Sequence, residues 1–175
     1  MHPVTVRRAQ IEDAEQIAAV HVSSWQQAFV GLVDSEYLNS LQPADRYAEW
    51  RARLQSTAST VIILVAELDG RIVGFGSSGM EDETKDWKVM SIYFLSEAWG
   101  SGLGHVLMTA LEAFLREQGA DRAALDVHPG NARARSFYER RGWVSSGVPY
   151  LLSLRGLQIP ALRYEIVLGG SSPCE

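Results

Sequence analysis

Two runs rich in β-branched residues meet at a two-residue turn, and this feature constrains the fold of the chain most strongly. The runs are Val61 to Leu68 and Arg71 to Ser77, and Asp69-Gly70 separates them. Asp-Gly suits a hairpin turn because both of its residues readily adopt a positive φ. The sequence therefore predicts an antiparallel pair of strands in the middle of the chain.

Strand-like and helical segments alternate on both sides of this hairpin. Apolar patterning predicts strands over 4–8, 87–95, 123–127 and 162–168, and another from Trp143 onward. Helical spacing with capping residues predicts helices from Asp13 to about Gly31, over 43–54, from Leu103 to about Gln118, and from Asn131 to Arg141. This order is typical of an α+β domain in which a βαβ-like unit follows the hairpin.

Length and composition restrict the class of protein. A chain of 175 residues with 46% hydrophobic residues suits one compact domain, which we expect over 1–168. The net charge of -5 argues against a general nucleic-acid binder and favours a cationic substrate. No secretory signal pattern or membrane-length apolar run is apparent, so we expect a cytoplasmic protein that does not bind membranes.

The end of the chain differs from the rest in composition. Residues 169–175 read GGSSPCE, which predicts a disordered tail. The tail contains Cys174, the chain's one cysteine, so we expect neither an internal disulfide nor a zinc cluster.

A glycine-rich turn lies between a predicted strand and a predicted helix. It reads WGSGLGH over 99–105. Glycines let a backbone approach a ligand closely, and free N–H groups at a helix start attract anions such as phosphates. The spacing fits neither the dinucleotide fingerprint nor the P-loop. From these residues alone, a phosphate site and a turn for close strand-to-helix packing remain equal alternatives.

A second motif, NARARSFYERRGW over 131–143, follows the glycine turn after a helix and a strand. Together with the IYF strand at 92–94 and GSGLG, this order resembles the GCN5-related N-acetyltransferase (GNAT) superfamily. The resemblance is sharpest over 89–143, includes the hairpin, and is loose over the first 60 residues. It implies a mixed, mostly antiparallel central sheet flanked by helices, with acyl-CoA bound at a splay between two central strands. It also implies acetyl transfer from acetyl-CoA to a primary amine, without a metal.

The resemblance also implies which residues bind the donor. Backbone N–H groups of the turn would bind the pyrophosphate of coenzyme A, namely those of Gly100, Gly102, Leu103, Gly104 and His105. The backbones of Ile92 and Phe94 would pair with the pantetheine arm like an added strand. Asn131 would cap its helix, contact pantetheine, or do both. The family usually begins this turn with Arg or Gln, so Trp99 implies weaker or differently arranged phosphate contacts.

The sequence offers a candidate for the general acid but no clear candidate for the general base. By resemblance, Tyr138 would donate a proton to the departing thiolate, whereas from helical spacing alone it would simply pack beside Phe137. No residue stands out as the general base. The candidates are Glu67, Glu81, Asp82, Glu83, Asp126, His21 and His128, and we favour solvated or structural roles for most of them.

The acceptor site would involve the N-terminal helices and C-terminal strands, with Trp25, Phe29, Tyr37 and Tyr150 as candidates and core packing as the alternative for the first helix. A small-molecule amine is the favoured acceptor. The rival hypotheses are acetylation of a protein N-terminus or lysine, a non-catalytic acyl-CoA sensor, and a nucleotide-binding module. The sequence leaves homodimerisation open.

Overall fold

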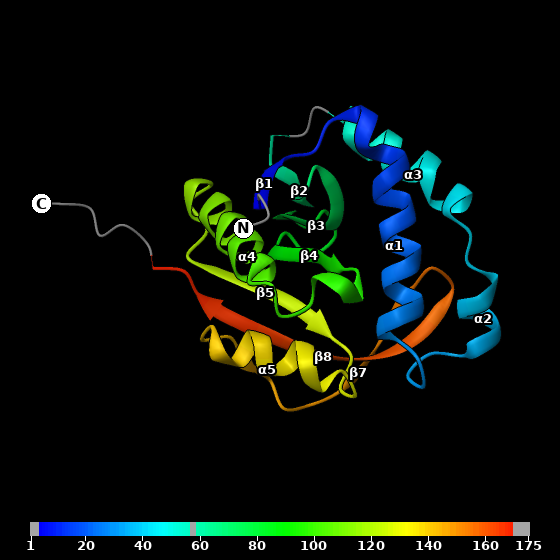
Figure 1. Cartoon of the computed structure of the whole chain (residues 1–175). Helices are drawn as coiled ribbons and strands as arrows, with labels where there is room; N and C mark the ends of the chain where they lie inside the picture. Colours follow the sequence, from blue (N-terminus) through cyan, green and yellow to red (C-terminus); the bar gives the residue numbers. More distant parts are fainter. Residues whose placement is uncertain (1–3, 57–58, 170–175) are drawn as a thin grey trace, which may run out of the picture.

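The computed structural model describes residues 4–56 and 59–169, which form a central sheet with helices on both faces (Figure 1). The strands are β1 (Val4–Arg8), β2 (Val61–Leu68), β3 (Arg71–Met80), β4 (Trp87–Phe94), β5 (Arg122–Val127), β6 (Val144–Ser145), β7 (Tyr150–Leu154) and β8 (Leu157–Val167). The helices are α1 (Ala14–Ala28), α2 (Ser35–Ser40), α3 (Pro43–Gln55), α4 (Leu103–Glu117) and α5 (Ala132–Arg140). Short 3-10 turns, Ile11–Asp13 and Ser96–Ala98, precede α1 and the glycine turn.

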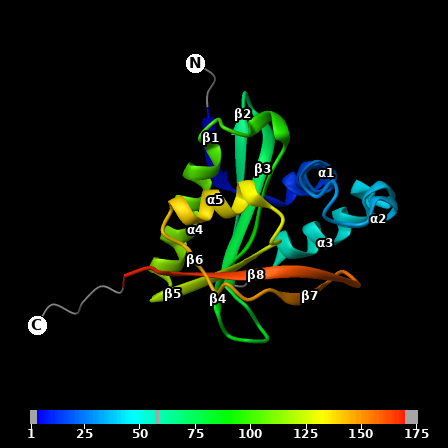
Figure 2. The ribbon, with the colours of Figure 1, turned by 90° about the horizontal axis from the view of Figure 1, so that it is seen from below.

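The described strands form a mostly antiparallel sheet in the order β1-β2-β3-β4-β5-β8-β6, with β7 paired beside it to β8. Only β4 and β5 run parallel. Helices α4 and α5 cover one face, and α1 to α3 lie on the other (Figure 2). The expected α+β fold, a mixed sheet flanked by helices, is confirmed.

The predicted hairpin is confirmed as β2 and β3, with Asp69 and Gly70 at φ 53° and 75°. The structure adds two elements that the sequence patterns did not predict. One is α2, and the other is the hairpin of β7 and β8, which turns at Arg155-Gly156 with φ of 53° and 80°. The sequence patterns missed α2 because it is only six residues long. They missed the second hairpin because Pro160 interrupts the alternating pattern of β8.

Each face of the sheet has its own apolar core. Leu107, Leu111 and Leu115 of α4 are fully buried against β4, β5 and β8. Ile17 and Trp50, from α1 and α3, pack with Phe75 of β3 on the opposite face. Both cores lie close to β4, so the sheet is held rigidly at its centre.

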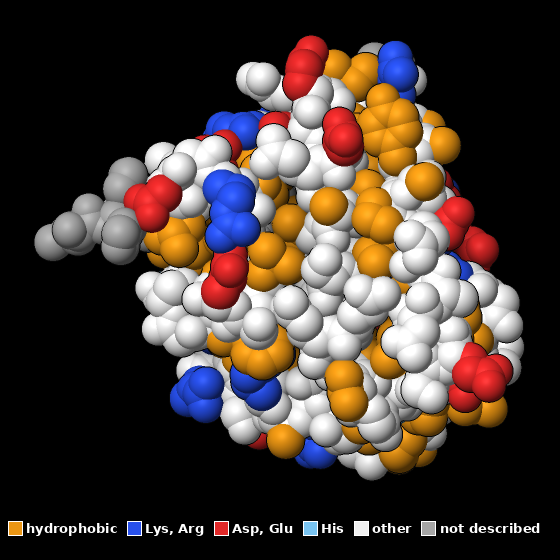
Figure 3. Space-filling model, turned by 45° about the vertical axis from the view of Figure 1, so that its right-hand side comes forward, with side chains coloured by type: hydrophobic (Ala, Val, Ile, Leu, Met, Phe, Trp, Pro, Cys, Tyr) orange, Lys and Arg blue, Asp and Glu red, His pale blue; other side chains and the backbone are white. Residues whose placement is uncertain are grey.

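Charged side chains of both signs are mixed on the face that Figure 3 shows. Figure 3 shows acidic and basic side chains spread around one face of the molecule, without an extended patch of one sign. In the part of the chain that the structure describes, no helix is long and apolar enough to cross a membrane. The predicted tail falls outside the described residues apart from Gly169, and so does Cys174.

His21 is a structural residue of the α1 core. Its side chain is 5% exposed, and its Nδ1 accepts a hydrogen bond of 3.0 Å from Trp50 Nε1. The ring stacks on Tyr93 at 5.5 Å. Burial, together with the positive charges of Arg155 and Arg46, lowers the pKa of His21 to about 3. The imidazole is therefore neutral, carries its proton on Nε2, and has no free lone pair for a base.

Acidification should destabilise the protein through His21. Between about pH 7.5 and pH 5 the unfolded imidazole takes up a proton and the folded one does not, because the folded pKa lies near 3 rather than 6.5. The unfolded state then binds more protons, and the free energy of unfolding falls by about 2 kcal/mol. Urea unfolding of wild type and His21→Gln at both pH values measures this difference. Equal losses in the two proteins would contradict it.

Candidate active site

The centre of the sheet is split between β4 and β5. Their ladder contains a single pair, Lys88 with Ala124, after which the strands separate. A β-bulge adds to the divergence, because Ser77 pairs with Ser91 while Ser78 pairs with Val89. Met90 is the extra residue of this bulge. A cavity of about 880 Å³ opens where the strands part.

The free edge of β4 faces this cavity. Tyr93 pairs with Phe75 of β3, and the next alternate residue, Leu95, donates its N–H to Val73 at 2.9 Å. In an antiparallel ladder the intervening residues direct their N–H and C=O groups the other way. Ile92 and Phe94 therefore present backbone donors and acceptors to the splay, where the resemblance places the pantetheine arm.

The glycine turn lies at one end of the cavity. Gly100 and Gly102 have φ of 78° and 86°, a left-handed conformation that favours glycine, and Gly102 is the N-cap of α4. Gly100, Gly102 and Gly104 line the cavity. The amide of Leu103 instead donates to Ser101 Oγ at 3.3 Å, and that of His105 donates to Gly102 O at 3.0 Å. All five amides stay predicted phosphate donors, and those of Leu103 and His105 also make these internal hydrogen bonds.

Charge is distributed unevenly along the cavity. Near the glycine turn and α5, its lining includes His105, Arg133, Arg140 and Arg141. Among the described lining residues, Asp126 of β5 is the one carboxylate. Arg141 forms an ion pair of 2.8 Å with the buried Glu112, which also accepts a hydrogen bond from Trp143 Nε1. The cavity is thus cationic at the end that would receive phosphates.

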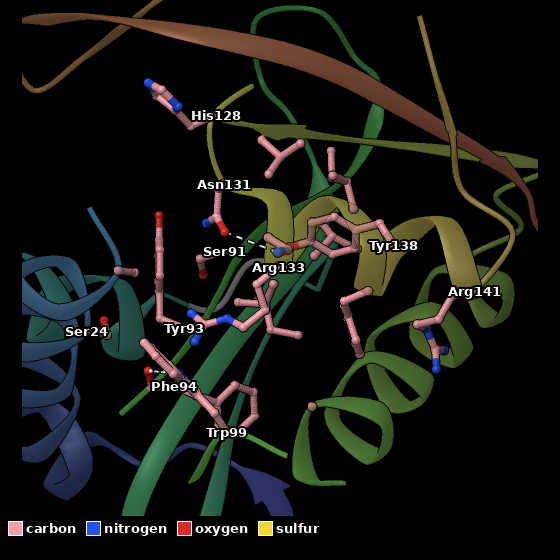
Figure 4. A pocket seen from close by; sticks show the side chains of 18 of the residues that line it. Ser24, Ser91, Tyr93, Phe94, Trp99, His128, Asn131, Arg133, Tyr138 and Arg141 are labelled. Atoms are coloured by element: carbon pink, nitrogen blue, oxygen red, sulfur yellow. Dashed lines mark hydrogen bonds between the residues drawn. The ribbon is translucent and has the colours of Figure 1, made fainter. Parts of the chain in front are cut away.

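Tyr138 forms part of the cavity wall between the split strands and α5 (Figure 4). The residue is 7% exposed and packs against Phe137, Trp143 and Tyr164. Its hydroxyl makes no hydrogen bond to another described residue. Burial, with a smaller effect of Tyr93, raises its pKa above the usual value near 10. The phenol is therefore a protonated donor that faces the cavity.

Asn131 begins α5 beside the same cavity. Its Oδ1 accepts a hydrogen bond of 3.1 Å from the Ala134 amide, which is the cap that the sequence predicts. Because only Oδ1 serves the cap, the Nδ2 donor remains for a ligand. The two alternative roles of Asn131 are thus compatible.

The candidate bases lie in different surroundings. Asp126 contacts Lys88 at 3.3 Å and accepts a hydrogen bond from Tyr150. Glu81 pairs with the same lysine at 2.9 Å. His128 lines the cavity, but its Nδ1 accepts from the Gly130 amide, and burial lowers its pKa. Neutral His128 therefore carries its proton on Nε2 and offers no free lone pair.

The remaining candidates lie outside the cavity lining. Glu67 pairs with Arg7 at 2.6 Å, and the exposed Asp82 lies 3.9 Å from Lys85. Glu83 and Tyr37 do not line the cavity either. No group of three or more His, Cys, Asp or Glu side chains among the described residues is placed to hold a metal ion.

Aromatic side chains form the wall on the α1 side. Phe29 and Tyr93 line the cavity, and Trp25 packs behind Phe29 with ring centroids 4.7 Å apart. Sequence reasoning named Phe29 and Trp25 but missed Tyr93, Ser24 and Arg133. The sequence could have placed Tyr93, because strand alternation puts its side chain on the opposite face of β4 from those of Ile92 and Phe94.

Fold and site together define an acyl-CoA-dependent acyltransferase. Residues 23–143 match the acetyltransferase (GNAT) family, and the chain belongs to this family. It is 34% identical to the uncharacterized N-acetyltransferase YuaI of Bacillus subtilis over 119 residues, about two thirds (66%) of either chain. It is 24% identical to spermidine N(1)-acetyltransferase of Thermoplasma acidophilum over 145 residues, covering 80% of this chain and 88% of the relative.

A solved structure shows the same fold. YncA of Salmonella typhimurium, a putative acetyltransferase with its cofactor acetyl-CoA, superposes with a TM-score of 0.72 at 19% identity. The match covers 99% of this chain and 98% of YncA. The described chain therefore has the same overall fold as this neighbour.

A side chain at Gly104 should block the donor site. A Cβ there would lie 3.7 Å from Phe137 and 3.8 Å from Phe94, which is ordinary contact, so the fold should tolerate substitution. In Gly104→Val the added methyl groups would occupy space at the glycine turn. We expect coenzyme A affinity, measured by calorimetry, to fall at least tenfold, roughly the loss of one charge-assisted hydrogen bond. Gly104→Ala is the matched control, with a smaller loss. A normally melting Gly104→Val protein that binds as tightly as wild type would refute the assignment.

Proposed function

We propose that the protein transfers an acetyl group from acetyl-CoA to a primary amine of a small molecule, with Tyr138 as general acid. The observation that carries the proposal is the Tyr138 hydroxyl in the wall of a cavity between the glycine turn and the free edge of β4. A donor extended along Ile92 and Phe94, with its phosphates at the turn, would bring its thioester towards this hydroxyl.

The reaction requires proton transfers at the amine and at the thiolate. The neutral amine attacks the thioester carbonyl, the C–N bond forms, the C–S bond breaks, and the nitrogen releases its surplus proton to solvent. An ordinary amine has a pKa near ~10, so it must first lose a proton, and the thiolate, with a pKa near ~8.5, gains one as it leaves. Tyr138 supplies the proton for the thiolate, because its phenol is protonated near neutrality and lines the cavity.

The part of the cavity around Asp126 suits a cationic amine. Asp126 contributes negative charge there, and with Glu81 and Lys88 it forms a cluster of two carboxylates and one ammonium. Phe29 and Tyr93 add aromatic faces, which attract cations and apolar groups. The relative named spermidine N(1)-acetyltransferase also supports a small amine acceptor.

Replacing Tyr138 should slow turnover while leaving donor binding intact. Tyr138→Phe keeps the packing of the ring and removes the proton donor, so we expect kcat to fall by about 10²-fold. Coenzyme A affinity should change little. Tyr164→Phe is the control, because that phenol binds Glu139 and Arg135 outside the cavity lining. Unchanged turnover of Tyr138→Phe across the pH range would remove Tyr138 from the mechanism.

A panel of amines tests the function itself. Thiol release from acetyl-CoA is measured with spermidine, aromatic and aliphatic monoamines, and peptides with free N-termini or lysines. Release that depends on a small amine is the expected result. Release only with peptides would indicate a protein acceptor, and calorimetric binding of acetyl-CoA without release from any amine would favour a sensor.

A further inference from the structure

Arg133 stacks on Trp99 at the mouth of the cavity. Its guanidinium carbon lies 3.1 Å from the centroid of the Trp99 ring. In Figure 4 the Arg133 side chain extends from α5 across the cavity towards Trp99, the first residue of the glycine turn. The stack therefore joins the two sides of the groove that separates α5 from the glycine turn.

Trp99 is itself held in place. Its Nε1 donates a hydrogen bond of 3.2 Å to the carbonyl oxygen of Phe94, and its ring is 39% exposed. Because that carbonyl belongs to the free edge of β4, the bond fixes the indole beside the path proposed for the donor. A carbonyl oxygen has two lone pairs, so Phe94 can still accept from a ligand.

The stack leaves the hydrogen-bonding edge of Arg133 unused. The guanidinium makes no ion pair or hydrogen bond with any other described residue. By contrast, Arg141 in the same cavity is tied to Glu112 at 2.8 Å. Stacking uses the flat face of a guanidinium, while its five N–H donors lie in the plane and remain free for an anion.

An exposed arginine is usually mobile, and ordering its side chain opposes binding by up to about 2 kcal/mol. The aromatic contact offsets part of this ordering before a ligand arrives. Arg133 is thus a positioned cation without an anion, next to the glycine turn whose amides face the same cavity. This combination is complementary to a doubly charged diphosphate.

We propose that Arg133 binds the diphosphate of coenzyme A and that Trp99 is its positioning residue. The proposal rests on the function proposed above. It also explains how a turn that begins with an uncharged residue obtains a cation. The charge comes from α5, and the aromatic ring at position 99 holds it over the groove.

The two residues also connect donor binding to the shape of the groove. A diphosphate held by both the glycine turn and Arg133 would be clamped between α4 and α5. The alternative is that the stack merely obstructs the groove in the free protein, in which case removing Arg133 would tighten binding.

Calorimetry with three ligands tests the role of Arg133. We expect Arg133→Met to weaken binding of coenzyme A roughly tenfold, the scale of one charge-assisted hydrogen bond, and to weaken binding of 3′-dephospho-coenzyme A equally. Binding of pantetheine, which lacks the diphosphate, should not change. Arg51→Met on α3 is the control for loss of one positive charge, because Arg51 does not line the cavity and hydrogen-bonds to Tyr47, which does not line it either.

Three results would overturn this role. Weakening seen with coenzyme A but not with its dephospho form would assign Arg133 to the 3′-phosphate. Tighter binding by Arg133→Met would make the stack an obstruction, and unchanged binding would leave Arg133 without a role. If wild type itself binds no coenzyme A, the proposed function fails and not merely this extension.

A double-mutant cycle tests the role of Trp99. Trp99→Leu should weaken coenzyme A binding, and Trp99→Phe should weaken it less, because phenylalanine keeps the stack while both variants lose the bond to Phe94. Adding Trp99→Leu to Arg133→Met should then cause little further loss. Fully additive losses, or equal effects of the leucine and phenylalanine variants, would show that Trp99 does not act through Arg133.

Discussion

The parting of β4 from β5 is the constraint on which the rest of the site depends. A strand edge at the centre of a sheet carries backbone donors and acceptors that need partners. Here the ladder stops after Lys88 and Ala124, and the bulge at Met90 turns the strand away. The two apolar cores keep the opening from closing, so the free edge of β4 remains available to a ligand that can hydrogen-bond like a strand.

Positive and negative side chains line the cavity from different elements of the fold. Arg133 and Arg140 of α5, Arg141 and His105 line the cavity near the glycine turn and α5, and Asp126 of β5 is the one carboxylate among its described lining residues. An anionic donor and the cationic acceptor proposed here would therefore be attracted to different residues of one cavity. Tyr138 lines the same cavity. The two reactants would meet beside Tyr138, so the charges that bind them would also orient them relative to each other.

Local patterns carried most of what the sequence could predict. Asp69-Gly70, the glycine turn and the Asn131 cap act within a few residues, and the structure shows all three. The α2 helix and the turn at Arg155-Gly156 were missed because neither has a long periodic pattern. The contact of Arg133 with Trp99 was missed for another reason. It joins residues from two elements, and no spacing along one chain segment reveals such a pair.

The two interpretations of Tyr138 from the sequence, a packed ring and a proton donor, are compatible. Spacing on a helix favoured a packed ring, and the resemblance implied a proton donor. The structure packs the ring against Trp143 and Tyr164, and this burial raises the pKa of the phenol. A phenol with a raised pKa is protonated near neutrality, so it carries a proton for a departing thiolate, but it is a weaker acid than a solvent-exposed tyrosine. The same packing therefore stabilises the fold and holds a protonated hydroxyl in the cavity wall.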